Sequence, residues 1–503
     1  MPALPRRDLF ALLALALLVH MSAAQFIRAP GYMDDAYYFG GALRLAQGQG
    51  FTEPYLWNYL DSPTGLPHPS HLYWMPLTSV VAAASMAAFG QSFAAARLPL
   101  VLLASLLPLM AYAVAMQLTG VRRQASAAGL ITLFSGFYPA FWGTTDSFAL
   151  FAVTGAGTLF AIGRGMQTGR WQWWLAAGVG AGLAHLTRAD GLLLLAVGLL
   201  LALTSRRYPH TPILFLGYSL VTLPWFIRNT QIAGSPFGAG GGALWLVQYN
   251  DLFNYPPNLS AAQFFAAGWR AIALSKWQAV TLNLQTIIAV QGLVFMAPLI
   301  ALGLWRLRRH ALIRPVLAYA ALLYAAMTFA FSLPGARGGL FHSGVALLPF
   351  YMPLGMIGLD AAVDWVAGRR KTWDAETAKR VFTGGAVGLA ILLTVAMLAT
   401  RLPSWNNGDA LFREIGAVFP GDAGVMSNNP PGFWVATGHP GVMVPNGNVS
   451  TLLAVADKFG MRYVLLDRNY PAGLAELYRA ESGERLTLVG RWDEWKLFEV
   501  SRP

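Results

Sequence analysis

Long apolar segments alternate with short polar loops along most of the chain, a pattern typical of a protein that crosses a membrane many times. We predict about eleven spans, each near the ~20 residues that a helix needs to cross a bilayer. Arg6-Arg7 ahead of the apolar run 9–20 also resembles a secretory signal sequence, but the many later spans favour a retained first helix. The predicted spans are residues 8–26, 97–119, 124–141, 147–163, 173–188, 190–205, 211–228, 283–304, 315–333, 343–366 and 381–400.

Three longer segments lie on the side of the membrane opposite the amino terminus. Two of them connect spans, and the third is the carboxyl-terminal tail. Residues 28–96 contain an amphipathic stretch, 36–46, typical of an interfacial helix, and a more apolar one, 72–89, short enough to be interfacial or re-entrant. Residues 229–282 contain glycine and proline clusters that indicate irregular backbone. In the tail from Arg401, short apolar runs alternate with helix-like stretches. We therefore predict a mainly α, polytopic helical bundle over residues 1–400, followed by a small α/β domain over residues 401–503.

Composition supports this class. The chain is 56% hydrophobic and 12% charged, with a mean hydropathy of +0.48, whereas soluble domains carry about 25% charged residues. The net charge of +12 comes from basic clusters in short loops on one side of the spans, which follows the positive-inside rule and attracts anionic lipid. These clusters, which do not resemble a nucleic-acid surface, are Arg6-Arg7, Arg122-Arg123, Arg164 with Arg170, Arg206-Arg207, Arg306 to Arg314, and Arg369 to Lys371 with Lys379-Arg380.

This charge pattern predicts a cytoplasmic amino terminus, an extracytoplasmic tail and a location in the plasma (inner) membrane. The chain has no cysteine, which excludes disulfides and thiolate ligands. All strongly polar candidate residues fall on the outer side. They are Asp34, Asp35, His68, His71, Tyr73, Asp146, Arg188, Asp190, Arg228, Arg337 and His342. Carboxylates, arginine and histidine on one face of a helical bundle indicate a site for an anionic ligand.

Most of these residues also have an ordinary structural explanation. Asp34 and Asp146 fit helix caps, because Asp is favoured at the positive end of a helix. Arg188 and Asp190 fit a local ion pair at a tight turn, and Arg228 fits a side chain that reaches the lipid headgroups. Arg337 is the hardest to explain in this way, since its glycine-rich turn offers backbone amides to an anion but little structural reason for arginine.

The order of these motifs resembles the GT-C superfamily of membrane glycosyltransferases over about residues 1–360, in particular dolichyl-phosphate-mannose protein mannosyltransferases and lipid A aminoarabinose transferases. Asp34-Asp35 stands where those families carry an Asp-Glu pair after the first span. His68-Pro69-Ser70-His71-Leu72-Tyr73-Trp74 resembles their Lys-Pro-Pro element before Tyr-Trp, with His68 at the phosphate-binding lysine. The segments 89–99, 186–191 and 224–229 and Asp146 also fall where the superfamily has similar motifs.

The resemblance implies transfer of a hexose or pentose from a polyprenyl-phosphate carrier to a lipid, glycan or protein acceptor on the outer face, with inversion. It implies that Asp34 acts as the base, with Asp35 beside it. Asp146 orients the acceptor or joins Asp34 in holding a divalent metal ion. Because histidine is a less secure phosphate ligand than lysine, Arg188, Arg228 and Arg337 are expected to bind the phosphate.

Two other functions stay open from the sequence: a lipid or small-molecule transporter or flippase, and a non-catalytic membrane scaffold. Against the transporter, the chain shows no inverted repeat and its acids lie near the outer surface instead of the membrane midplane. Oligosaccharyltransferase activity is disfavoured, because the tail has no Trp-Trp-Asp signature.

Overall fold

The computed structural model describes residues 4–370 and 372–501, so Lys371 of the last basic cluster lies outside the described residues. The chain forms two compact units. The helical unit comprises the residues up to Phe26 together with Arg97–Trp225 and Lys276–Arg401, and the sheet unit comprises Ile27–Ala96, Phe226–Ser275 and the residues from Leu402.

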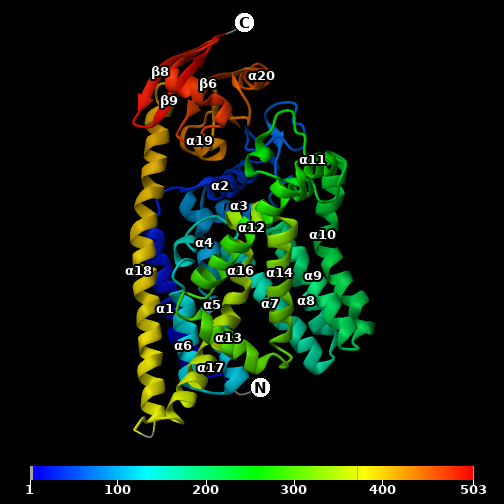
Figure 1. Cartoon of the computed structure of the whole chain (residues 1–503), viewed down its shortest axis with the longest axis vertical. Coiled ribbons are helices and arrows are strands. Elements are labelled where there is room, and N and C mark those ends of the chain that lie inside the picture. Colours follow the sequence, from blue (N-terminus) through cyan, green and yellow to red (C-terminus); the bar gives the residue numbers. More distant parts are fainter. Residues whose placement is uncertain (1–3, 371, 502–503) are drawn as a thin grey trace. The chain divides into compact units, whose positions relative to one another are not determined.

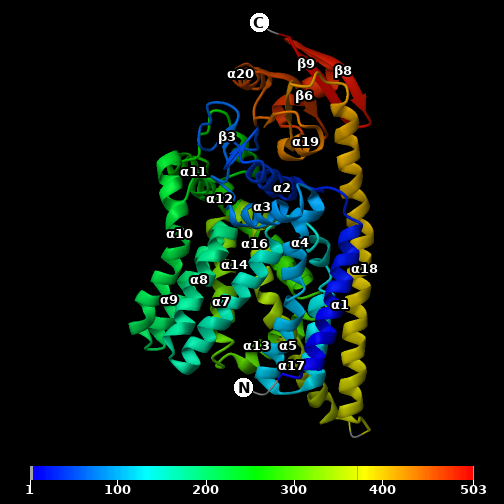
Figure 2. The same cartoon turned by 180° about the vertical axis from the view of Figure 1, so that it is seen from behind.

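Apolar helices pack against one another throughout the helical unit. In Figure 2, α7, α8 and α9 lie side by side, and α5 packs against α6 and α17. Helices α13 and α17 approach closely because each supplies a glycine: a Cβ on Gly303 would lie 2.0 Å from the Leu354 carbonyl oxygen, and one on Gly358 would lie 1.9 Å from that of Leu299. The helices are α1 (Arg6–Gln25), α5 (Leu107–Thr119), α6 (Arg122–Leu133), α7 (Phe148–Thr168), α8 (Trp171–Thr187), α9 (Leu192–Thr204), α13 (Ala297–Leu307), α14 (Arg314–Ala325), α16 (Leu340–Gly344) and α17 (Leu348–Ala367).

Four further helices contain the boundaries between the two units: α4 (Phe93–Ala104), α10 (Thr211–Ala233), α12 (Gly268–Gln285) and α18 (Ala375–Gly416). Within the described residues, six helical stretches have both the length and the apolar character needed to cross a bilayer, and four shorter apolar helices accompany them. The predicted span 283–304 is interrupted, because a π-helical turn at Thr286–Gln291 is followed by Leu293 and Val294 with positive φ. The chain is an integral membrane protein with a helical bundle, and the count of about eleven spans stays a prediction.

A mixed sheet organises the sheet unit, with the strand order β2-β5-β4-β6-β9-β8-β7. The first four strands are parallel and the last three are antiparallel. Strands β6, β8 and β9 lie together near the carboxyl end of the chain in Figure 1. Buried Val425, Val442, Val464 and Phe498 lie on its strands. The strands are β2 (Tyr55–Leu56), β4 (Gly424–Ser427), β5 (Gly441–Met443), β6 (Met461–Leu466), β7 (Ser482–Gly483), β8 (Leu486–Trp492) and β9 (Trp495–Val500), and the helices α19 (Pro430–Thr437), α20 (Val449–Phe459) and α21 (Ala475–Ala480) connect them.

The first long segment supplies the remaining elements of the sheet unit. Helices α2 (Met33–Ala46) and α3 (Leu77–Phe89) correspond to the two predicted interfacial stretches, and α11 (Ala261–Ala266) follows later in the chain. Helix α3 begins at Leu77, five residues later than predicted, because Met75-Pro76 ends an irregular loop. Strands β1 (Thr52–Glu53) and β3 (His68–Pro69) form a separate antiparallel pair in which Glu53 lies opposite His68.

Candidate functional site

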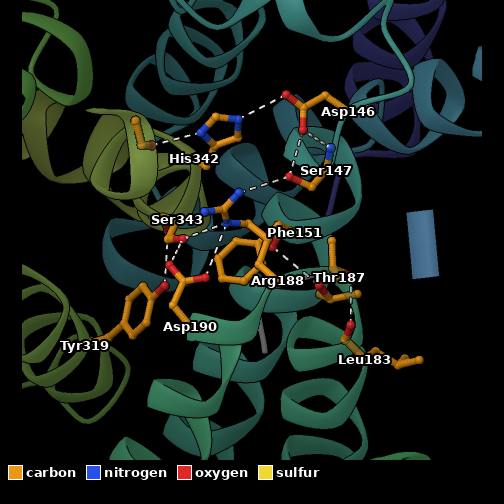
Figure 3. A network of polar contacts seen from close by, with 12 residues as sticks. Asp146, Ser147, Phe151, Leu183, Thr187, Arg188, Asp190, Tyr319, His342 and Ser343 are labelled. Atoms are coloured by element: carbon orange, nitrogen blue, oxygen red, sulfur yellow. Dashed lines mark hydrogen bonds and ion pairs between the residues drawn. The ribbon is translucent and has the colours of Figure 1, made fainter. Parts of the chain in front are cut away.

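A buried polar network occupies the helical unit, and it includes the buried carboxylate of Asp146 (Figure 3). Asp146 lies in the turn just before α7, and its side chain is 0% exposed. Its Oδ1 accepts hydrogen bonds from the backbone N–H of Ser147 and, at 2.9 Å, from the Ser147 hydroxyl. Its Oδ2 lies 3.0 Å from Nε2 of His342. Because a buried carboxylate is costly unless it is paired, these contacts define Asp146 as a held, oriented group.

The hydrogen bonds of His342 determine how protons are arranged at this pair. Its Nδ1 lies 2.9 Å from the carbonyl oxygen of Gly338, which accepts only, so Nδ1 carries a proton. If Asp146 is ionised, Nε2 must also donate, and His342 is then an imidazolium. The ring stacks on Phe148 with centroids 4.0 Å apart, which keeps its orientation. His342 and Asp146 therefore form an ion pair, or share one proton between them.

Arg188 and Asp190 lie between α8 and α9 and continue the network (Figure 3). Arg188 Nε is 3.3 Å from Asp190 Oδ1 and 3.1 Å from the Ser343 hydroxyl, and its Nη1 is 3.4 Å from the Ser147 hydroxyl. Ser343 donates to Asp190 Oδ2, and the Tyr319 hydroxyl donates to the Ser343 carbonyl at 3.2 Å. The local ion pair expected from the sequence is present. Ser343 bridges its two members, and Ser147 connects Arg188 to Asp146.

Arg337 lies near this network in sequence but differs from it in environment. It is exposed at a kink within Gly335–Gly339, where Gly338 has a φ of 129°. The carbonyl of Gly338 is the one that holds His342. A side chain at Gly338 would be strained at this φ, so the kink that presents Arg337 and the hydrogen bond that orients His342 depend on the same glycine.

In the sheet unit, Asp34 and Asp35 occupy the first turn of α2, the position where carboxylates favour a helix start. Asp35 is fully buried, and its Oδ2 accepts from the backbone N–H of Gly31 at 3.3 Å. Asp34 is only half-buried. The pair is thus divided into a buried carboxylate that organises the turn and a more accessible one beside it.

His71 lies in the loop that precedes α3, and the side chains of His71 and Arg228 hold this loop in place by hydrogen bonds. His71 Nδ1 lies 2.8 Å from the Ser70 hydroxyl and Nε2 lies 2.9 Å from the Ser79 hydroxyl. Burial, with a smaller effect from Arg228, lowers the pKa of His71 to about 3, so this residue is neutral. Arg228 Nη2 donates to the carbonyls of Ser70 at 3.0 Å and Phe51 at 3.4 Å.

His68 is held between two carboxylates that the sequence did not identify as partners. Its Nε2 lies 2.9 Å from Asp61 Oδ2, and its Nδ1 lies 3.6 Å from Glu53 Oε1. Burial by itself lowers the pKa of His68. The combined effect of Asp61 and Glu53 is larger and opposite, so the pKa of His68 is raised to about 9. Burial raises the pKa of Glu53 to about 7, although His68 opposes this. Tyr73 packs edge-on against Trp57, with centroids 4.8 Å apart.

Comparison with known proteins gives matches at the level of family model and fold. Residues 68–230 match the model of the dolichyl-phosphate-mannose-protein mannosyltransferase family. A comparison with curated proteins gives no match. The crystal structure of ArnT from Cupriavidus metallidurans bound to undecaprenyl phosphate is 15% identical, with a TM-score of 0.61 over 98% of this chain and 99% of that one.

Archaeal oligosaccharyltransferase structures are also similar. The Archaeoglobus fulgidus enzyme tethered with an acceptor peptide is 15% identical, with a TM-score of 0.59 over 94% of this chain and 70% of that one. AglB from the same organism, in complex with an inhibitory peptide and a dolichol-phosphate, is 12% identical, with a TM-score of 0.54 over 91% and 69% of the two chains. The chain therefore has the GT-C fold of membrane glycosyltransferases, as its sequence motifs predicted.

Proposed function

We propose that this protein transfers a sugar from a polyprenyl-phosphate carrier to an acceptor on the outer face of the membrane. The observation that carries the proposal is the match in fold, over almost the full length of both chains, to ArnT bound to undecaprenyl phosphate. The family-model match to residues 68–230 supports the same chemistry. The buried network of the helical unit adds acidic and cationic groups of the kind such a reaction needs.

The leaving group of this reaction is a lipid phosphate, which needs cationic neutralisation. We assign this role to Arg188, Arg228 and Arg337, since arginine binds phosphate oxygens through two parallel hydrogen bonds. Arg188 contacts two neutral hydroxyls at 3.1 and 3.4 Å, and phosphate oxygens are stronger acceptors than these. His68 is a weaker candidate, because Asp61 and Glu53 already surround its ring.

The acceptor hydroxyl must lose a proton as it attacks the anomeric carbon. We propose Asp34 as this base, because it is the more accessible member of its pair, and Asp35 as the group that positions it. A single displacement by an acceptor activated in this way inverts the anomeric carbon. Asp146, held by His342 and Ser147, is proposed to orient the acceptor.

A divalent metal ion held by Asp34 and Asp146 stays a prediction. Carboxylate oxygens are the ligands that Mg²⁺ and Ca²⁺ prefer, and the imidazole beside Asp146 is a ligand for transition metals. Treatment with EDTA followed by addition of Mg²⁺, Mn²⁺ or Zn²⁺ tests the prediction, since metal-dependent transfer is lost with the chelator and restored by one of these ions.

The proposed topology places the amino terminus in the cytoplasm and the tail from Arg401 outside, as the basic loops indicate. The proposed location is the plasma (inner) membrane. The polyprenyl chain then lies among apolar spans, where burial supplies affinity but little specificity. The acceptor is a lipid, a glycan or a protein.

Lipid-linked sugars in cells with and without this protein test the proposal. Loss of the protein should make one polyprenyl-phosphate sugar accumulate, and wild-type protein should reverse this. Asp34→Asn should not reverse it, because removing a general base lowers turnover by ~10²–10⁴. The matched control is Asp409→Asn, a partly buried carboxylate whose partner is the exposed Arg413. Normal complementation by a well-expressed Asp34→Asn protein would contradict the assignment of the base.

A further inference from the structure

The first long segment of the sheet unit encloses a small pocket that the proposed transfer chemistry does not use. The empty space between its lining residues is about 270 Å³ with open solvent included, and the enclosed part has room for a group about the size of one water molecule. The lining is both polar and aromatic. Its polar residues are Glu53, Asn58, Asp61 and His68, and its aromatic residues are Tyr37, Trp57 and Tyr73.

Two buried polar atoms of this pocket have no hydrogen-bond partner. Glu53 is 5% exposed, and its Oε2 is unpaired. Nδ1 of His68 is also unpaired, at 3.6 Å from the nearer Glu53 oxygen. A buried polar atom left in this state costs about 1–3 kcal/mol, so a pair of them in one pocket points to a ligand that satisfies both.

The protonation of His68 defines what that ligand must offer. Its Nε2 donates to Asp61 at 2.9 Å, and with a pKa of about 9 the ring also carries a proton on Nδ1 at neutral pH. The pocket therefore presents an unpaired donor, Nδ1–H, beside an unpaired acceptor, Glu53 Oε2. A hydroxyl group satisfies both, because its oxygen accepts one hydrogen bond while its proton is donated in another.

An ammonium group or a metal ion fits this arrangement less well. An ammonium group has no acceptor for the Nδ1 proton of His68. The carboxylates of Asp61 and Glu53 lie at opposite nitrogens of the His68 ring, so they do not converge on one cation. The positive charge of His68 also neutralises the negative charge of one of the two carboxylates, which weakens the attraction of the pocket for a cation.

The aromatic side of the pocket is rigid before any ligand arrives. Trp57 stacks on Trp74 with centroids 4.2 Å apart and planes 12° apart, and Tyr73 meets Trp57 edge-on. Ordered aromatic walls with a few placed polar groups are typical of small-molecule sites. Because these rings are already held, little conformational entropy is lost when an apolar face of a ligand rests on them.

We propose that this pocket binds one hydroxyl of a sugar ring, held by Glu53 and His68, while the ring lies at the mouth against Tyr73. The inference rests on the proposed glycosyl transfer for the statement that a sugar is a substrate. The sugar belongs either to the donor or to the acceptor, and both present the same hydroxyl chemistry.

Saturation-transfer NMR on the full chain in detergent tests binding without any catalysis. The probes are methyl α-D-mannopyranoside, methyl α-D-glucopyranoside and methyl α-D-galactopyranoside. At least one should bind wild-type protein, and Glu53→Met should weaken that binding tenfold or more by removing the acceptor. Tyr73→Leu, at a less buried position, should weaken it by a smaller factor. Glu499→Met is the matched control, because Glu499 pairs with Arg462 on the sheet surface outside the pocket.

Thermal denaturation separates loss of the site from loss of the fold. Glu53→Met should unfold at a temperature close to that of wild type, because removal of the buried unpaired Oε2 offsets the lost contact between Oε1 and Nδ1 of His68. Absence of a Glu53-dependent signal for all three glycosides would overturn the proposal and leave a pocket that holds water. Tighter binding of methylamine than of any glycoside would also overturn it.

The transfer assay then identifies the source of the sugar. Glu53→Met should raise KM for one substrate about tenfold with kcat little changed, for the donor if its sugar occupies the pocket and for the acceptor otherwise. If the protein transfers no sugar, the NMR result still decides the inference, so its failure and that of the proposed function are distinguishable.

Discussion

The contact between Asp146 and His342 allows a quantitative prediction about the network of the helical unit, if the two residues form an ion pair. Asp146 is completely buried, and Nε2 of His342 lies 3.0 Å from its Oδ2. His342→Ala leaves this carboxylate without its partner, which should cost about 3–5 kcal/mol of stability. Asp146→Asn should cost less, within about 1.5 kcal/mol, because the amide donates to Nε2 of a neutral His342 and the hydrogen bond survives.

A variant that carries both substitutions tests whether Asp146 and His342 are ionised in the folded protein. In the Asp146→Asn background, His342→Ala leaves the buried, neutral amide of the new asparagine without its hydrogen-bond partner, which costs about 1–3 kcal/mol of stability. The coupling energy of the double-mutant cycle should therefore be about 2 kcal/mol. Denaturation of the purified protein in detergent measures all four variants. If His342→Ala is equally destabilising with and without Asp146→Asn, the pair is not ionised and the proposed orienting role of Asp146 loses its basis.

Three other predictions concern charge, packing and the phosphate. The His68 pKa is raised from 6.5 to about 9 and the Glu53 pKa from 4.5 to about 7, so each group binds its proton more tightly in the folded state and contributes stability that is lost as pH rises. The temperature midpoint of denaturation should therefore decrease as pH is raised, through Glu53 from pH 4.5 to 7 and through His68 from pH 6.5 to 9, and His68→Gln should flatten the upper part of that slope. Arg188→Lys, Arg228→Lys and Arg337→Lys should each lower kcat/KM for the donor about tenfold through loss of the planar fork, and an unchanged value measured in the transfer assay would remove that arginine from the phosphate site. Gly358→Leu should prevent α13 from approaching α17 and lower the yield of folded protein in size-exclusion chromatography, whereas Gly388→Leu, at a position with open space, should not.

The sequence predicted the helical elements well where apolar runs were long. The observed ends of helices α1, α7 and α8 differ from the predicted ends by one to five residues, because the apolar character of these helices continues up to polar ends. The prediction for residues 229–282 missed the start of α12 at Gly268, since Arg270 and Lys276 lower the hydropathy of that helix. Strand β2 was also missed, because two residues carry no pattern and its partner β5 is remote in the sequence.

The candidate site was predictable only where its contacts are local. Arg188 and Asp190 are two residues apart, so their ion pair follows from spacing. Ser147 and Ser343 gave no signal, because serine occurs throughout apolar helices and only the fold brings these two to Arg188. The partners of His68 depend on the pairing of β1 with β3, which places Glu53 opposite it. Tertiary contacts of this kind cannot be read from a single sequence.

Transfer by the purified protein tests the central claim most directly. The full chain, reconstituted into liposomes, is incubated with a polyprenyl-phosphate sugar identified by its accumulation in cells that lack the protein, together with a membrane extract as acceptor. The account predicts release of free polyprenyl phosphate and a product whose anomeric configuration is inverted relative to the donor, with both lost in Asp34→Asn. A product that retains the donor configuration, or donor that crosses the bilayer unchanged while no sugar is transferred, would contradict it.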